Sequence, residues 1–172
     1  MATGARYKVQ FRRIRKGRTD YRARKQMLIS RKPRLVVRKS LNHTNMQLIL
    51  PAKEGDVTLA SSNTAELKKY GYTGGTGNIP SAYLAGLLLG YRAKKMGHAE
   101  AILDIGLYQT TKGGIIFAAM KGAINAGLEI PHDPAIFPSD DRIAGKHIDK
   151  FRKTNISEQL EAVKQKIQGE FR

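Results

Sequence analysis

Arginine side chains placed directly beside aromatic rings are the groups in this sequence best suited to chemistry. Arg12 and Arg13 follow Phe11, and Arg22 follows Tyr21. Lysine and arginine attract phosphates without reading base sequence, whereas guanidinium planes and aromatic rings stack on unpaired bases. The mixture therefore predicts an arm that binds nucleic acid, and its suitability for unpaired bases favours RNA over DNA.

The positive charge of the chain is concentrated around these residues. The 172 residues include 31 Lys/Arg and 14 Asp/Glu, a net charge of +17. Residues 1–40 hold fifteen of the basic residues and one acid, a net charge of +14, whereas residues 41–172 have a net charge of only +3. An almost neutral globule with a basic N-terminal segment indicates a polyanionic partner.

Two other interpretations of the basic segment remain open. A solvated charge run or a localisation signal would have the same composition. A membrane-surface arm needs bulky apolar residues on one helix face, and Phe11, Ile14 and Tyr21 do not form one. Nucleic acid is therefore favoured over both alternatives.

Asp104, in "ILDIG", is the one acid whose position is typical of a metal-dependent nuclease. A carboxylate on a central strand can hold a catalytic ion, but such a site needs several converging acids. The other acids that could contribute are Glu66, Glu100, Asp140 and Asp141, and their spacing supports no site. A hydrogen-bonded structural role is favoured for Asp104.

The remaining candidates for chemistry are weak. The histidines show no metal-ligand spacing; they are His43, His98, His132 and His147. The stretch "GYTGGTGN" (71–78) lacks the Gly-Lys-Ser/Thr ending of a nucleotide-binding loop and follows a predicted helix, so it is a flexible connector or a loop that approaches an RNA backbone. We predict no enzyme, no metal and no cofactor.

Composition limits the class of protein further. Hydrophobic residues make up 41% of the chain, enough for a core, and there is no cysteine. The N-terminus lacks the apolar stretch of a signal peptide. The longest apolar run, 82–89, is far shorter than the ~20 residues that span a bilayer. We expect a soluble, cytoplasmic protein without a membrane partner or small-molecule substrate.

The elements that must position the arm follow from periodicity and capping signals. Alternation after Pro33 places Leu35 and Val37 on one face of a strand, with Arg34, Val36 and Arg38 on the other. The expected strands are 34–40, 44–51, 56–61 and 101–106, and the expected helices are 63–71, 80–97 and about 114–126, with a further helix possible at 21–30. This order predicts an α/β or α+β fold, a mixed sheet covered by helices.

The C-terminal segment from Asn155 is a separate amphipathic unit. Ile156, Leu160, Val163 and Ile167 repeat at helical spacing, and Glu158 follows the expected cap Asn155 by three residues. So narrow an apolar stripe needs a partner, either in this domain or in a neighbouring protein. The sequence leaves that choice open.

Five segments, in order, carry a resemblance that covers most of the chain. They are "YKVQFRRIRKGRTDYRARKQMLI", "KPRLVVRKS", "GNIPSAYLAGLLLGYRA", "LDIGL" and "FAAMKGAINAGLEIPH". Together, from about Tyr7 to Phe151, they resemble the 5S-rRNA-binding family of the large ribosomal subunit, number eighteen in the bacterial series. The long basic arm is similar to the archaeal branch. Ile14, Lys16 and Asn125 depart from the usual family residues, and 152–172 match poorly.

The resemblance implies a fold and a set of partners. The fold is an α/β domain with a ribonuclease-H-like mixed sheet that has no nuclease activity. The implied function is a structural constituent of the large subunit that binds 5S rRNA and anchors it to the large rRNA and neighbouring proteins in the central protuberance. The expected divisions are a basic arm (1–32), the α/β domain (33–151) and a C-terminal helical extension (152–172).

The RNA-binding residues fall on the arm, along the first strand and at its turn. The family pattern and the charge of the arm together give Tyr7, Lys8, Phe11, Arg12, Arg13, Arg15, Lys16, Gly17, Arg18, Thr19, Tyr21, Arg22, Arg24, Arg34, Arg38, Lys39, Ser40, Asn42, His43 and Thr44. Asp20 is expected to pair with Arg18 or Arg22. The free arm is expected to be disordered until RNA binds, because like charges repel and it has little to bury.

Overall fold

The computed structural model describes residues 4–171 of the chain. The ends of the predicted arm (1–3) and of the predicted extension (172) lie outside this range. In chain order the elements are α1 (Arg12–Arg15), α2 (Tyr21–Ile29), β1 (Arg34–Lys39), β2 (Thr44–Ala52), β3 (Gly55–Asn63), η1 (Thr64–Tyr70), α3 (Ile79–Lys95), β4 (Ile102–Asp104), α4 (Ile115–Asn125), η2 (Pro134–Ile136), α5 (Asp140–Ala144), α6 (Lys146–Arg152) and α7 (Ile156–Glu170).

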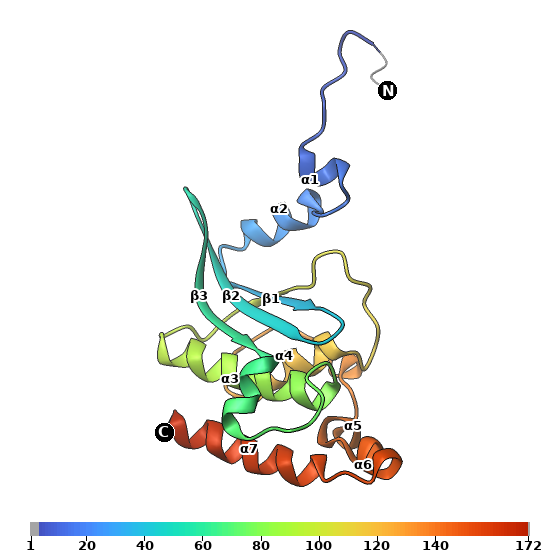
Figure 1. Cartoon of the computed structure of the whole chain (residues 1–172). Coiled ribbons are helices and arrows are strands. Elements are labelled where there is room, and N and C mark those ends of the chain that lie inside the picture. Colours follow the sequence, from blue (N-terminus) through green and yellow to red (C-terminus); the bar gives the residue numbers. More distant parts are fainter. Residues whose placement is uncertain (1–3, 172) are drawn as a thin grey trace.

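The four strands form one mixed sheet in the order β3-β2-β1-β4 (Figure 1). Strands β1, β2 and β3 are an antiparallel meander, and β4 joins β1 in parallel, with Leu35 opposite Leu103. The predicted α/β class and mixed sheet are confirmed. The more specific likeness to ribonuclease H sheets stays a prediction.

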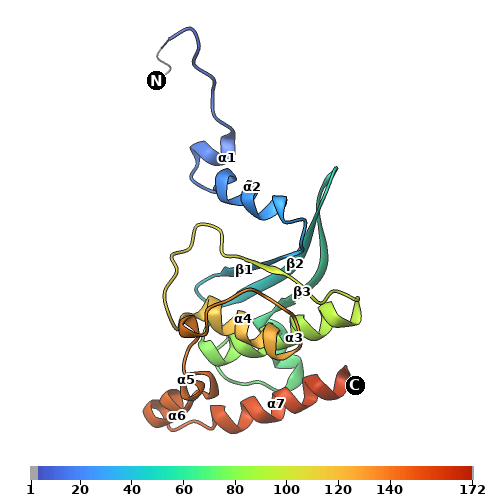
Figure 2. The ribbon, with the colours of Figure 1, turned by 180° about the vertical axis from the view of Figure 1, so that it is seen from behind.

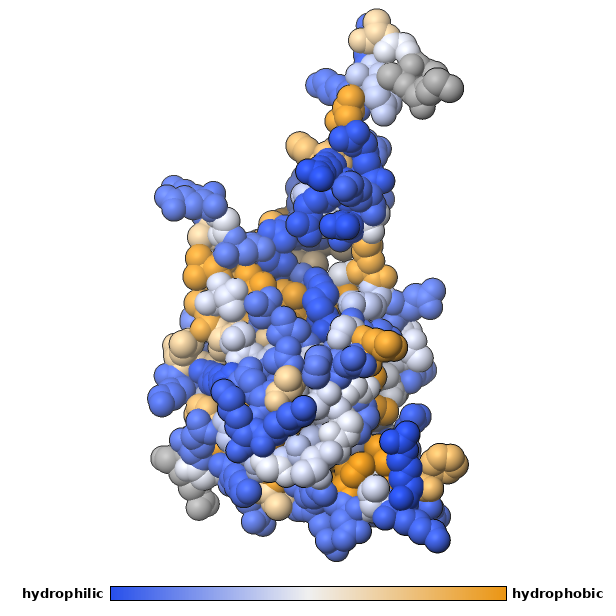
Figure 3. Space-filling model, in the orientation of Figure 1, coloured by the Kyte–Doolittle hydropathy of each residue, from blue (hydrophilic) through white to orange (hydrophobic). Residues whose placement is uncertain are grey.

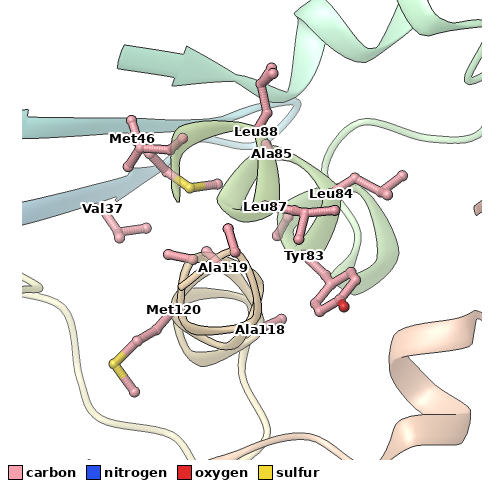
Figure 4. Packing of buried hydrophobic residues seen from close by; sticks show 14 of the residues in the cluster. Val37, Met46, Tyr83, Leu84, Ala85, Leu87, Leu88, Ala118, Ala119 and Met120 are labelled. Atoms are coloured by element: carbon pink, nitrogen blue, oxygen red, sulfur yellow. The ribbon is translucent and has the colours of Figure 1, made fainter. Parts of the chain in front are cut away.

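Strand β1 alternates as its sequence predicts. Leu35 and Val37 are fully buried and belong to the main hydrophobic core. Figure 4 shows Val37 on the side of the sheet that faces α3 and α4. Val36 points to the opposite face, where it lines a small cavity with Met27 of α2 and Ile49 of β2. Both faces of the first strand are therefore covered.

Helix α3 is the centre of the core. Thirteen of its 17 residues are buried, because it packs on β2, β3, η1, α4, α5 and α7. Its backbone touches that of α4: a Cβ at Gly86 would lie 2.0 Å from the carbonyl oxygen of Ala119, and one at Gly122 would lie 2.1 Å from that of Tyr83. Only glycine permits this approach, which brings the two helices together beneath the sheet.

Local capping signals fix where the helices begin. The side chains of Asn78 and Ser81 form a reciprocal capping box at the start of α3. Asn63 and Glu66 do the same for η1, which ends at Gly71 with φ +90°. The predicted helix at 63–71 is thus present, as a 3-10 helix.

Helix α7 buries its apolar stripe within the same chain. Ile156, Leu160, Val163 and Ile167 all belong to the main core, and α7 packs on α3, η1, α5 and α6. The open question of a partner is resolved in favour of this domain. The expected cap Asn155 makes no capping hydrogen bond; instead the Asp149 carboxylate accepts from the backbone N–H groups of Ile156 and Ser157 at 2.7 and 3.0 Å.

The basic arm and the C-terminal helices lie at opposite ends of the molecule. Helices α1 and α2 stand above the sheet, and α6 and α7 lie on the far side of α3 and α4 (Figures 1 and 2). The sheet and its two main helices therefore separate the two regions.

Candidate nucleic-acid interface

The arm contains two short helices joined by a tight turn. Gly17, with φ +57°, ends the first helical turn, and Arg13 Nε donates a hydrogen bond of 2.9 Å to Thr19 Oγ1 across it. Asp20 caps α2 by accepting from the backbone N–H groups of Arg22 and Ala23 at 2.8 and 3.1 Å. The prediction that Asp20 pairs with the side chain of Arg18 or Arg22 is therefore wrong, because the Asp20 carboxylate caps α2.

Two aromatic rings hold the turn together from the outside. The ring centroids of Phe11 and Tyr21 are 5.9 Å apart with a tilt of 41°. Phe11 is nevertheless 73% exposed and Tyr21 37%. Residues expected to be disordered in the free arm thus have local structure of their own, and an exposed ring face remains for a base.

A chain of ion pairs attaches α2 to the sheet. Arg24 Nη2 donates to both carboxylate oxygens of Asp56, at 2.9 and 2.8 Å, and Arg34 Nη2 donates to Asp56 Oδ2 at 2.9 Å. Partial burial acts to raise the pKa of Asp56, but the hydrogen bonds from the two arginines outweigh it and hold the pKa below its usual value. Asp56 therefore carries its charge between the arm and β1.

The series of ion pairs continues from Arg34 to Asp104 in the protein interior. Arg34 Nη1 donates to Asp104 Oδ2 at 2.8 Å, and Arg38 Nη2 donates to Oδ1 at 2.9 Å. The backbone N–H of Gly106 also donates to Oδ1, at 2.9 Å. Both carboxylate oxygens are thus occupied by protein donors, which agrees with the structural role favoured for Asp104 over metal binding.

The turn after β1 forms the other end of the predicted surface. The Ser40 side chain accepts from the His43 backbone N–H at 3.0 Å and donates to the His43 carbonyl at 2.9 Å. Behind it, Tyr108 donates to the Lys39 carbonyl at 2.5 Å, and the Lys39 ammonium lies 5.7 Å from the Tyr108 ring centroid. The turn is therefore rigid and presents Lys39 and Asn42 to solvent.

The glycine-rich loop packs on this turn. Thr76 Oγ1 donates to the Asn42 carbonyl at 2.7 Å, and a Cβ at Gly77 would lie 2.9 Å from the Leu41 carbonyl oxygen. On its other side the loop contacts α7, where Thr73 Oγ1 donates to Gln159 at 2.9 Å. The loop is thus a connector anchored at both sides.

Most of the predicted RNA-binding residues are accessible, and Figure 3 shows hydrophilic side chains over most of the arm. The exposed ones are Tyr7, Lys8, Phe11, Arg12, Arg13, Arg15, Lys16, Gly17, Arg18, Tyr21, Arg22, Lys39, Ser40 and Asn42. The half-buried ones are Thr19, Arg24, Arg38 and His43. These residues extend from the arm to the turn after β1.

Two predicted contacts need correction. Arg34 is only 2% exposed, and its guanidinium is bound by Asp56 and Asp104, so it positions the arm instead of facing RNA. Thr44 is 1% exposed, and its backbone N–H donates to Thr64 Oγ1 at 3.0 Å. Charge and sequence position suggested exposure for Arg34, but the strand face that carries it lies beneath α2.

Sequence reasoning missed two residues that support this surface. Asp56 was seen only as the start of a strand, and Tyr108 was not singled out. The pairing of Asp56 with Arg34 spans 22 positions and that of Tyr108 with Lys39 spans 69. The only signal for Asp56 was the surplus of arginine in residues 1–40, which hold a single acid, because such a surplus indicates pairing with acids elsewhere in the chain.

Metal-dependent nucleases need a cluster of acids, and membrane proteins need a spanning helix, so both features were sought within residues 4–171. No group of three or more His, Asp or Glu side chains is placed to hold a metal ion within this range. None of the helices described is both long enough and apolar enough to cross a membrane.

Comparison with known proteins decides the family. A family model described as "Ribosomal large subunit proteins 60S L5, and 50S L18" matches residues 5–100 and 91–133. The chain belongs to this family. The large ribosomal subunit protein uL18 of Methanococcoides burtonii is 50% identical over 172 residues, which is 99% of each chain. The one from Caldivirga maquilingensis is 55% identical over 152 residues, 88% of this chain and 73% of the relative.

A third relative extends the same result. The uL18 of Methanoregula boonei is 55% identical over 148 residues, covering 86% of this chain and 85% of its own length. The expected likeness to the archaeal branch of the family is confirmed. The uL18 match to Methanococcoides burtonii also includes the C-terminal segment that had matched the family pattern poorly.

Proposed function

We propose that this chain is a structural constituent of the large ribosomal subunit, where it binds 5S rRNA and anchors it to the large rRNA in the central protuberance. Membership of the uL18 family supports assembly into the large subunit. The 5S rRNA and the neighbouring proteins of the central protuberance are the specific partners. The role is structural and not enzymatic.

The observation that carries the RNA proposal is the exposed row of cations on α1 and the following turn. Arg12, Arg13, Arg15, Lys16 and Arg18 are all exposed, and none of them forms an ion pair with an acid among the residues described. A surface of unpaired cations attracts phosphates, and the exposed rings beside it can stack on unpaired bases.

The ion pairs of Asp56 with Arg24 and Arg34 attach this basic surface to the sheet. Arg24 and Arg34 hold Asp56 from both sides, so α2 lies against the sheet before any RNA arrives. A positioned arm loses less conformational entropy on binding than a fully disordered one. We propose that the arm (1–32) is the RNA-binding part, the α/β domain (33–151) is its platform, and the extension (152–172) completes the core by covering α3.

The test is a salt series with 5S rRNA and with duplex DNA of the same length. Replacing Arg12, Arg13 and Arg15 together by alanine should make the log–log salt slope shallower by about two units, at ~0.7–0.9 per phosphate contact. A matched variant with Lys68, Lys69 and Lys95 replaced by alanine loses the same charge outside the arm and should keep the wild-type slope. Equal affinity of the wild type for both polymers would reduce the arm to a nonspecific polycation.

A further inference from the structure

A groove lies at the end of the molecule opposite the arm, between the glycine-rich loop and the helices α6 and α7. Its volume of about 770 Å³ is within the range of pockets that hold small organic groups. Gly74, Gly75 and Gly77 line one wall of the groove. Ile148 and Ile156 provide apolar surface.

An aromatic ring at this groove is almost completely open to solvent. Phe151, at the end of α6, is 87% exposed, more than Phe11 on the arm at 73%. The side chain lines the groove together with Arg152 and Gln159. An exposed aromatic face beside an arginine is a platform on which a nucleobase can stack.

The charge around the groove favours an anion. Lys150, Arg152 and Lys153 are exposed and form no ion pair with an acid among the residues described, whereas Lys146 is paired with Asp141. The one acid of this segment, Asp149, has both carboxylate oxygens bound by the N-terminus of α7 and by the side chains of Thr154 and Ser157. These three exposed cations outnumber the two acids of the region, Asp149 and the exposed Glu158, so the groove carries a surplus of positive charge.

We propose that this groove is a second RNA contact, which receives an unpaired nucleotide of ribosomal RNA. Phe151 stacks on the base, and Lys150, Arg152 and Lys153 bind the phosphates on either side of it. Single-stranded RNA fits both features of the groove, because its bases can stack on Phe151 and its phosphates can bind the surplus of positive charge. A protein segment has no such combination of flat bases and regularly spaced negative charge. The site rests on the proposed function and extends it, because a contact opposite the arm lets one chain hold two separate parts of the RNA.

Tryptophan fluorescence can test the site directly, since the chain contains no tryptophan. Phe151→Trp places the only fluorophore of this type at the groove, and the exposed position tolerates the larger ring. The matched control is Met96→Trp, because Met96 is 59% exposed and follows Lys94 and Lys95 but does not line the groove. The probes are a single-stranded oligouridylate and 5S rRNA, each titrated into the full chain.

Stacking should quench the Phe151→Trp fluorescence strongly as the oligouridylate is added and leave Met96→Trp nearly unchanged. Adding Lys150→Ala and Arg152→Ala to Phe151→Trp should move the quenching midpoint to at least about five-fold higher RNA concentration, since two phosphate contacts are lost. Without quenching of Phe151→Trp by either RNA, or with equal quenching of both variants, the groove is not an RNA contact and a protein partner is the better occupant.

The same titration separates this inference from the proposed function. Binding of 5S rRNA by the full chain can be followed by gel shift in parallel with fluorescence. If the gel shift persists while Phe151→Trp is silent, the arm binds RNA and only the groove proposal fails. If neither RNA gives a gel shift with the wild type, the proposed function itself fails.

Discussion

Arg34 and Asp104 form an ion pair of 2.8 Å between two neighbouring parallel strands, with only 2% and 6% of their side chains exposed. The pair lies at the inner end of a chain that passes through Asp56 to Arg24 on the arm. Arg34, whose charge suggested a contact with RNA, therefore connects the core to the basic arm. This connection makes the orientation of the arm a property of the folded domain.

Removing Arg34 should destabilise the whole domain. Arg34→Ala leaves Asp104 buried with one cationic partner instead of two, and breaking a buried ion pair from one side costs roughly 3–5 kcal/mol. We expect a loss of about 3 kcal/mol, near the lower end, because Arg38 remains bound to Asp104. Chemical denaturation measures this loss. The half-exposed pair of Arg92 and Glu66 is the control, since Arg92→Ala should cost about 1 kcal/mol or less.

Releasing Asp56 should detach α2 without unfolding the core. Asp56→Asn removes the charge that Arg24 and Arg34 share, so we expect faster amide hydrogen exchange from Arg24 to Ile29 and unchanged exchange in α3. Glu54→Gln, in the same hairpin turn, removes an exposed acid that forms no ion pair among the described residues and should leave exchange unchanged. Unaltered exchange of α2 in Asp56→Asn would show that other contacts hold the arm.

The contact between α3 and α4 should tolerate no side chain at its closest point. In Gly86→Ala the new Cβ would lie 2.0 Å from the Ala119 carbonyl oxygen, so the helices must move apart, with a loss of roughly 3 kcal/mol or more. Gly169→Ala is the control: Gly169 lies in a helix with nothing within 4 Å of a new Cβ, and there alanine should stabilise by up to about 1 kcal/mol. Thermal unfolding of both variants checks the opposite signs.

Acid should weaken the start of α7 through Asp149. Burial acts to raise the pKa of Asp149, but hydrogen bonds from Ile156, Ser157 and Thr154 outweigh it and lower the pKa to about 2, against 3.8 for an ordinary Asp. The folded state thus favours the charged form, and this stabilisation is present above about pH 4 and lost as the pH falls toward 2. An NMR titration of the carboxyl carbon should give a midpoint near 2.

Variants at the same helix start provide an independent check. Asp149→Asn should lower stability at pH 6, and its difference from the wild type should shrink as the pH falls from about 4 through 2. Asn155→Ala should have little effect at either pH, because the Asn155 side chain makes no capping hydrogen bond. A large loss in Asn155→Ala would return the capping role to the residue that the sequence pattern indicated.

Local patterns predict the elements well because their causes are local. The alternation of Leu35 and Val37 reflects one face of β1 against the core, and Asn63 with Glu66 is a capping box within four residues. The stripe from Ile156 to Ile167 likewise indicates a helix with one buried face. None of these signals states which other element covers the face, and so the partner of α7 stayed open.

The candidate site was predicted less completely, because its support depends on long-range pairings. Apart from the half-buried Ile14 and Thr19, the arm residues from Tyr7 to Arg22 are exposed, as their charge indicates. Arg34 has the same charge, but its two acid partners lie 22 and 70 positions away. Asp149 reaches α7 across a turn that returns the chain at Lys153, with φ +52°, and neither its reach nor that turn is visible in residue spacing.

The place of α7 in the chain has a consequence for synthesis. It follows all four strands and both α3 and α4 in sequence, yet it covers part of α3, the most buried helix of the molecule. While the polypeptide grows from its N-terminus, that side of α3 stays open to solvent, and exposed apolar surface on an incomplete chain favours aggregation. The apolar side of α3 is therefore covered only after α7, the last helix of the chain, has been synthesised and has packed on it.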